Sequence, residues 1–335
     1  MQPMLPMTKL PSTNYNEIIP PGEDEKFAAY AQKLRAIQKA KSKKYGKGRL
    51  LHRKGLLALK AELKVDANLP AHAAQGIFAR PGKYEVLVRL SNGGLDVKAD
   101  KMPDIRGFAF KVKGVSGKSV LSGGAQSEQD FLLINHSAFG AARAEEFLEL
   151  LLALNAGGGA VLKHLYKTHG FVGMFRAMGR LAKTIGKKFT GFASENFSTV
   201  APVKNGAYAV KLRIRPLTKM TVAFNKADLA DDLRTHLKSA PIEYAVELQF
   251  FTDAQTTPIE DSSVEWSETL SPFVRVGTLV IPAQELSGAG YEKLAAETEV
   301  SKFDPWNAIE EHRPLGNIMR ARKHAYYVSQ NERGA

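Results

Sequence analysis

Seven stretches with the residue pattern of β-strands constrain the fold of this chain more than any other feature. They cover residues 56–65, 82–92, 103–112, 130–135, 208–216, 244–252 and 273–282. Many of the segments between them contain glycine or serine, and strands at this spacing predict a mostly antiparallel sheet or barrel. Helical periodicity predicts helices outside the sheet, over residues 25–44, 139–154, 227–238 and 317–333. The expected fold class is therefore α+β.

The composition is that of a globular protein without thiol chemistry. The chain has 335 residues, of which 44% are hydrophobic and 24% charged, so it can bury a core in one large domain or two small ones. It contains no cysteine, which excludes disulfides, thiol catalysis and cysteine-ligated zinc. No apolar run reaches the roughly 18 residues that span a bilayer, and residues 1–27 lack the apolar core of a secretory signal. We expect a cytoplasmic protein, with the periplasm as the alternative.

The net charge of +13 is the second global feature of the sequence. It favours nucleic acid or an anionic membrane as partner, but no nucleic-acid-binding motif accompanies it, so we expect no nucleic acid to bind. The most basic stretch, from Lys163 to Lys188, holds seven Lys or Arg residues and no acidic residue, and its apolar positions are roughly amphipathic. Contact with an anionic membrane is one interpretation. The favoured one is a basic helix pair packed on the barrel.

The last predicted helix, Asn317–Arg333, carries three chemically active side chains on one face. Arg322 and Tyr326 lie four residues apart, and Arg333 lies seven further on. Ionising a free phenol at pH 7 costs about 4 kcal/mol, and a fixed cation at hydrogen-bond range offsets part of that cost. A phenolate is a hard ligand for ferric iron, and tyrosine holds haem iron in some enzymes. The alternative for this pattern alone is a surface arginine beside a half-buried tyrosine.

Two other residues attract attention for different reasons. His52 lies where a strand begins, beside Leu50 and Leu51, and the alternative to a catalytic role there is a packed core histidine. Arg89 lies inside a strand that is apolar on both faces. A buried guanidinium is costly unless it meets an anion. The sequence therefore predicts a buried anion near Arg89.

Taken together, these features resemble the core domain of the haem catalases. The resemblance runs from about Arg49 to Arg333. It rests on stretches that occur in the family's order: RLLHRKG, VRLSNGG, PDIRGFAFKVKG, DFLLINHSAF, PIEDSSVEW, SPFVRVGTLVIPAQ, FDPWNAIEEHRPLGNI and RARKHAY. It implies an antiparallel β-barrel core with surrounding helices and a C-terminal proximal helix. Residues 1–45 would form an N-terminal arm and helix, and residues 46–335 the haem domain.

The sequence departs from the family pattern in two places. The family's Arg-Phe-Ser reads Arg89-Leu90-Ser91, and its Asn-Asn-x-Pro turn reads Ile134-Asn135-His136-Ser137. In addition, the basic segment 158–190 matches no part of the large family members. Arg106, in the RGFA stretch, is expected to be structural.

The resemblance implies a role for each matching residue. His52 is the expected distal base above a haem, Asn135 the distal amide, and Ser91 the hydrogen-bond partner that fixes the histidine ring. Tyr326 is the expected iron ligand, with Arg322 beside its phenolate oxygen. The other expected haem contacts are Arg49, Arg89 and Arg333 at the propionates, and either Phe139 or Phe147 stacked on the porphyrin.

The implied cofactor is haem b with ferric iron, and the implied reaction is the breakdown of hydrogen peroxide or a small organic hydroperoxide. The enzyme would act as a catalase or, with an unknown electron donor, as a peroxidase. In relatives that convert fatty-acid hydroperoxides to allene oxides, a threonine precedes the distal histidine. Leu51 stands there in this chain, which favours hydrogen peroxide. The alternatives are a fatty-acid hydroperoxide-converting enzyme and a non-enzymatic haem-binding protein. Because members of the family usually assemble as oligomers, the resemblance also implies a homo-oligomer.

Overall fold

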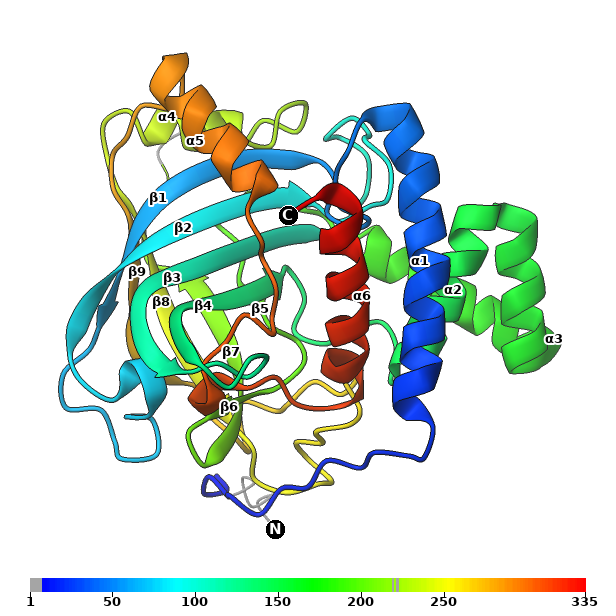
Figure 1. The fold of residues 1–335 in the computed structure, drawn as a ribbon, viewed down its shortest axis with the longest axis horizontal. Helices are drawn as coiled ribbons and strands as arrows, with labels where there is room; N and C mark the ends of the chain where they lie inside the picture. The colour runs from blue at the N-terminus through cyan, green and yellow to red at the C-terminus, as the bar shows by residue number, and fades with distance from the viewer. Residues whose placement is uncertain (1–7, 219, 221–222) are drawn as a thin grey trace, which may run out of the picture.

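A sheet of nine antiparallel strands closes into a barrel, and several helices are stacked along one side of it (Figure 1). The computed structural model describes residues 8–218, 220 and 223–335. The strands follow the order β5-β4-β3-β2-β1-β9-β8-β7-β6, and β5 also pairs with β7, which closes the barrel. Their bounds are β1 Gly55–Val65, β2 Gly82–Asn92, β3 Arg106–Lys118, β4 Ala125–Ile134, β5 Phe197–Ser198, β6 Val203–Asn205, β7 Tyr208–Pro216, β8 Ile242–Phe250 and β9 Val274–Ile281.

Side chains along β2, β3 and β4 point alternately into an apolar barrel interior and to an outer face that carries polar groups. The inward residues are almost completely buried: Val88, Leu90, Phe108, Phe110, Phe131 and Leu133. Because successive side chains point to opposite faces of a sheet, Arg89 and Ser91 of β2 and Ile134 of β4 lie on the outer face. The strand register sets Ser91 beside Gly107 and Gly107 beside Ile134. A row of small and apolar residues therefore crosses this face of the barrel.

Helices surround the barrel, as the sequence predicts. Their bounds in the described part of the chain are α1 Glu23–Tyr45, α2 Ala144–Ala156, α3 Gly158–Ile185, α4 Asp231–His236, α5 Gly288–Val300 and α6 Asn317–Arg333. The predictions for α1 and α6 are confirmed to within two residues, and the α+β class is confirmed. The helix α5 was not predicted, because its glycine-rich start hides the helical pattern.

Other boundaries differ from the prediction for local reasons. Helix α2 begins at Ala144 rather than at residue 139, because the preceding loop pairs with Ser262 through the Phe139 N–H and the Ala142 carbonyl. Helix α4 is shorter than 227–238, since the side chain of Asn225 accepts from the Ala227 N–H and closes a turn instead.

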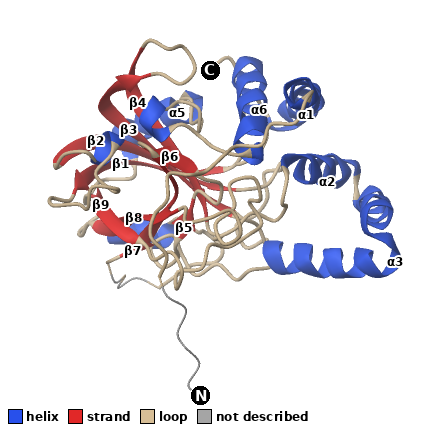
Figure 2. Cartoon of the chain, turned by 90° about the horizontal axis from the view of Figure 1, so that it is seen from below, coloured by secondary structure: helices blue, strands red, loops and turns tan. Residues whose placement is uncertain are grey.

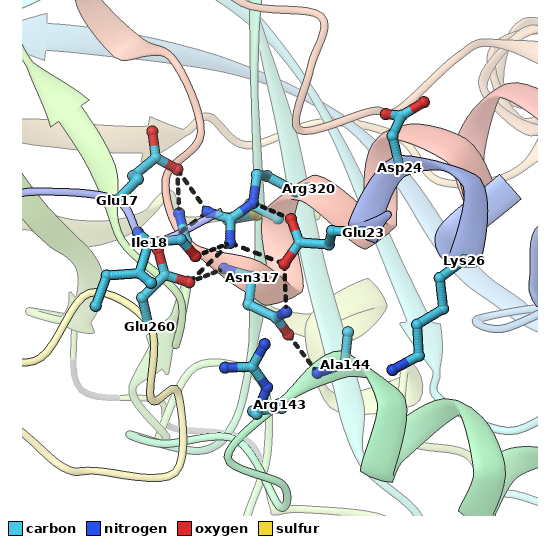
Figure 3. A network of polar contacts seen from close by, with 12 residues as sticks. Glu17, Ile18, Glu23, Asp24, Lys26, Arg143, Ala144, Glu260, Asn317 and Arg320 are labelled. Atoms are coloured by element: carbon cyan, nitrogen blue, oxygen red, sulfur yellow. Dashed lines mark hydrogen bonds and ion pairs between the residues drawn. The ribbon is translucent and has the colours of Figure 1, made fainter. Parts of the chain in front are cut away.

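The helix α6 lies beside α1, and a buried ionic network joins the two to the N-terminal arm (Figures 1 and 3). The guanidinium of Arg320 contacts Glu17 at 3.0 Å, Glu23 at 2.5 Å and Glu260 at 2.9 Å. Burial opposes the charge of Arg320, but the carboxylates of Glu23 and Glu260 raise its pKa above the ordinary value. Asn317 adds a hydrogen bond from its amide to Glu23 at 2.9 Å. The network fixes the start of α6 against α1.

The basic stretch forms the helix α3, which bends at Gly170, where φ is +67°. Its main contacts are with α2 rather than with the barrel, so the interpretation of a helix pair packed directly on the barrel is wrong for α3. Figure 2 shows α3 at the edge of the molecule, with its bend far from the barrel. None of the helices in the described ranges is long and apolar enough to cross a membrane.

Candidate active site

The backbone of His52 is held in an unusual conformation in the turn before β1. Its φ of +51° lies in the left-handed region, which residues other than glycine rarely adopt. The His52 N–H donates to the Gly93 carbonyl at 3.0 Å, and the His52 carbonyl accepts from Nη2 of Arg89 at 2.9 Å. The ring nitrogen Nδ1 lies 3.0 Å from Oγ of Ser91. Strained backbone that its surroundings hold in place clusters at functional sites.

Gly107 of β3 provides the space that the imidazole occupies. It lies opposite Ser91 in the strand register. A Cβ at this position would lie 2.7 Å from Oγ of Ser91 and would overlap the His52 ring. The site therefore requires glycine here. The sequence analysis missed this residue, and its only signal there is the RGFA stretch, whose contact with His52 follows from the register of β2 and β3.

The electrostatics keep His52 neutral. Burial lowers its pKa to about 3, and the positive charges of Arg89, Arg322 and Arg49 act in the same direction. A neutral imidazole has one unprotonated ring nitrogen and can accept a proton. We call the elements that carry His52, Ser91 and Gly107 the histidine wall of the site.

The tyrosine wall of the site is formed by α6. Nη2 of Arg322 donates to the phenol oxygen of Tyr326 at 3.0 Å, as the four-residue spacing predicts. Both side chains are partly exposed. The helix ends at Gly334 in the left-handed conformation, where the Ala335 N–H donates to the Gln330 carbonyl and completes a C-terminal cap. This cap lies one residue beyond Arg333 and fixes the end of the helix.

A cluster of three arginines joins the two walls. Arg49 and Arg89 both contact the carboxylate of Glu299, at 2.6 and 2.9 Å. Arg333 of α6 donates to the main-chain carbonyls of residues 299, 300 and 301. Burial lowers the pKa of Arg49 to about 9, and the charge of Arg89 lowers it further. We call these three residues and Glu299 the arginine cluster.

The arginine cluster has an excess of positive charge. Within the described residues, Glu299 is the one carboxylate in its ion pairs and binds Arg49 and Arg89, whereas Arg333 binds a main-chain carbonyl. The side chain of Arg89 is only 4% exposed. Guanidiniums form strong, charge-assisted hydrogen bonds with carboxylates, so a ligand with carboxylate groups would neutralise the excess charge. The sequence analysis did not identify Glu299, because α5 itself was missed.

Asn135 lies at the end of β4, one residue beyond the row that contains Ser91 and Gly107. It is buried, and Oδ1 accepts from the Arg106 N–H at 2.8 Å while Nδ2 donates to Glu195 at 3.2 Å. Lys187 also binds Glu195 and the Asn135 carbonyl. One amide hydrogen of Asn135 is left for another acceptor. The distal role of Asn135 stays a prediction, and its orientation depends on Glu195, which the sequence did not reveal.

The two phenylalanine candidates lie together. The rings of Phe139 and Phe147 meet edge to face with centroids 4.7 Å apart, and both are partly buried against the main core. The structure brings both candidates to one place and does not separate them. Arg106 is structural, as expected, because its guanidinium donates to Asn92 at 2.6 Å and to the carbonyls of Asp100 and Met102.

A cavity of about 370 Å³ reaches the arginine cluster from outside. It lies between the end of α1, the start of β1 and the face of α5. Arg89 and Glu299 line it, whereas His52 and Tyr326 do not. Of the arginine cluster, the cavity therefore exposes Arg89 and Glu299 from the side.

We compared the chain with known protein families, protein sequences and solved structures. No family model and no curated protein sequence matches the chain. Among solved structures, a fungal catalase is similar with a TM-score of 0.67 and 17% sequence identity, over 85% of this chain and 59% of that one. Catalase A from Saccharomyces cerevisiae is similar with a TM-score of 0.65 and 16% identity, over 85% and 61%. A bacterial catalase has a TM-score of 0.65 and 14% identity, over 99% and 67%.

These likenesses establish that the chain has the catalase fold. The predicted resemblance is thus confirmed at the level of structure, including the antiparallel barrel. The chain spans about 60% of the length of the fungal and yeast catalases. At such low sequence identity the comparison shows the fold alone, and activity must be argued from the residues of the site.

Proposed function

We propose that this protein binds haem b with ferric iron and breaks down hydrogen peroxide or a small organic hydroperoxide. The observation that carries the proposal is the arginine cluster, which joins the histidine wall to the tyrosine wall. Arg89 binds the His52 carbonyl, and Arg333 lies on the same helix as Tyr326. An excess of buried positive charge between two such walls suits the two propionates of a haem.

The side chains of the site would hold a haem at its propionates and at its iron. Arg49, Arg89 and Arg333 would bind the propionates, which replace or share the contacts now made by Glu299. The phenol oxygen of Tyr326 would ligate the iron. The hydrogen bond from Arg322, at 3.0 Å, would stabilise the phenolate form needed for that role.

A bound haem would supply redox-active iron for cleavage of the O–O bond. With Nδ1–H donating to Ser91, His52 has a free lone pair at Nε2. That nitrogen would take a proton from one oxygen of the peroxide and return it to the other, which departs as water. The remaining amide hydrogen of Asn135 would orient the peroxide.

Leu51 favours hydrogen peroxide over a fatty-acid hydroperoxide. Its side chain packs against the main core and has no hydrogen-bond donor for the neighbouring imidazole. The hydrogen-bond partner of the His52 ring is Ser91. The histidine is therefore free of the extra polar neighbour that marks the allene-oxide-forming relatives.

The first test is the absorption spectrum of the purified, haem-loaded protein, which should show ferric haem with a phenolate ligand. Tyr326→Phe should remove most of the haem or shift its spectrum, because a phenyl ring cannot ligate iron. Tyr327→Phe is the matched control, since this neighbouring tyrosine is 68% exposed. A Tyr326→Phe protein with full haem and an unshifted spectrum would show that the ligand is another residue.

The second test is turnover. The haem-loaded protein should release oxygen from hydrogen peroxide or oxidise a donor dye in its presence. Failure of both reactions, with haem correctly bound, would leave a haem-binding protein without this activity. Incubation with a fatty-acid hydroperoxide, followed by mass spectrometry, separates the remaining alternative, because we expect that compound to be unchanged.

A further inference from the structure

Exposed apolar side chains are concentrated on one small part of the molecule. Within the described residues, seven of the sixteen exposed large hydrophobic side chains fall between residues 154 and 178. They are Leu154, Leu162, Tyr166, Phe171, Val172, Phe175 and Met178. Single exposed apolar residues are ordinary, but a concentration of this kind marks an interaction site. The concentration lies on α3 and on the end of α2 that leads into it.

Three of the four exposed apolar residues beyond the bend in α3 form one stripe. Phe171, Phe175 and Met178 follow the spacing i, i+4 and i+7, which places them on a single face of a helix. They are 66%, 56% and 37% exposed, and the two phenylalanine rings meet edge to face at 5.3 Å. Ala177, which is buried, lies on another face. The stripe is therefore not the surface by which α3 packs on the protein.

Positive charges occupy another face of the same helix. Arg176, Arg180 and Lys183 form a second helical row, at spacings of four and three residues, on the side of the helix turned away from the apolar stripe. Before the bend, Lys163 and Lys167 flank Tyr166. The sequence from residue 150 to residue 194 contains no Asp or Glu. The charge is therefore uncompensated along the whole helix.

The position of α3 makes this surface available. Of its 28 residues, Leu165 and Ala177 are the ones classed as buried. Figure 2 shows the bend of α3 projecting at the edge of the molecule. An apolar face and a separate basic face, on a helix that lies along the outside, are the arrangement of helices that bind in the plane of a lipid surface.

We propose that α3 docks the protein on the surface of an anionic lipid bilayer. Phe171, Phe175 and Met178 enter the boundary between headgroups and acyl chains, and the long basic side chains of the same helix reach anionic headgroups. Charge decides between this occupant and a second copy of the chain. Two copies of α3 would bring uncompensated positive charges together, and the whole chain carries +13. Bilayer docking is peripheral and does not depend on the activity of the haem site.

The test is flotation of the full-length protein with vesicles. The protein should float with vesicles that contain phosphatidylglycerol, remain behind with pure phosphatidylcholine vesicles, and detach as the salt concentration rises. Phe171→Ser with Phe175→Ser, and separately Arg176→Glu with Arg180→Glu, should each weaken binding by about tenfold or more, because apolar burial and charge both contribute.

Matched controls separate α3 from the general surface. Lys83→Glu with Lys293→Glu makes the same change of charge at side chains that are 67% and 79% exposed elsewhere. Leu10→Ser with Leu121→Ser makes the same apolar-to-polar change at exposed positions. Both controls should float almost as the parent does. Circular dichroism verifies that all variants are folded.

Two results would overturn the proposal. One is flotation that is absent, or equal for the parent and for both α3 variants. The other is a change of molecular mass in solution when Phe171 and Phe175 are replaced, without vesicle binding by the parent. The second result would assign the surface to a copy of the same chain.

Discussion

The addition of one methyl group at Gly107 should disturb the imidazole of His52. Gly107→Ala places a Cβ where it overlaps that ring and lies 2.7 Å from Oγ of Ser91. The arginine cluster and Tyr326 do not touch Gly107, so we expect haem binding to survive. Peroxide breakdown should fall by about 10²-fold, the cost of displacing a reacting group by an ångström. Steady-state oxygen release is the measurement.

A control is available on the neighbouring strand. Gly82 begins β2 with no heavy atom within 4 Å of the place where a Cβ would be. Gly82→Ala should therefore leave both haem binding and activity unchanged. Full activity in Gly107→Ala would mean that the position of the His52 ring is unimportant.

Replacement of His52 tests its role as the base. His52→Ala should leave the haem in place and slow peroxide breakdown by about 10²–10⁴-fold, the usual contribution of a positioned general base. Ser91→Ala should have a smaller effect, because it removes the partner of Nδ1 but not the base itself. His169→Ala, at an exposed position on α3, is the control. The same loss in the control would point to damage unrelated to proton transfer.

At the scale of the elements, the packing of α6 on α1 decides whether the tyrosine wall is correctly placed. Arg320→Met leaves Glu17, Glu23 and Glu260 close together without their shared cation. The side chain of Arg320 is 12% exposed, and those of its partners 3–16%. Removing one partner of a buried ionic network costs about 3–5 kcal/mol. The free energy of unfolding, from urea titration, should fall by that amount.

The same helix provides the comparison for this experiment. Lys323 lies one turn further along α6 and is exposed, so Lys323→Met should change the free energy of unfolding by less than about 1 kcal/mol. Equal losses for the two variants would mean that the network around Arg320 contributes nothing special.

At the scale of the whole molecule, buried histidines make the stability depend on pH. Burial lowers the pKa of His312 to about 4 and that of His52 to about 3, from 6.5. Below pH 6.5 the unfolded chain binds these protons and the native state does not. Their contribution to stability is therefore complete above pH 6.5 and is lost as the pH falls toward 3. Burial raises the pKa of Asp130 to about 7, which acts in the opposite direction.

Comparison of variants isolates the part that His312 contributes. His312→Gln keeps an acceptor for the Ile77 N–H and a donor for the Lys204 carbonyl but removes the titration. Urea unfolding at pH 7 and pH 5 should show a larger loss of stability in the parent than in His312→Gln. An equal loss in both proteins would show that His312 is not the group that titrates.

The sequence by itself determined the parts of this protein that depend on local spacing. Seven of the nine barrel strands, the helices α1 and α6, and the contact between Arg322 and Tyr326 follow from periods of two or 3.6 residues. The short strands β5 and β6 were missed, because two or three residues are too few to show a period. The absence of cysteine and the excess of basic residues also required no structure. The haem ligands and the reaction stay predictions from resemblance.

The tertiary structure alone decided the contacts between residues distant in the chain. The register of β2 and β3 places Gly107 behind His52, and the packing of α5 brings Glu299 to the arginines. The tertiary structure also leaves the apolar stripe of α3 exposed, whereas the sequence favoured a helix packed on the barrel. The physical reason is that a helical or alternating pattern shows which face of an element is apolar. It does not show which neighbour, or what solvent, that face will meet.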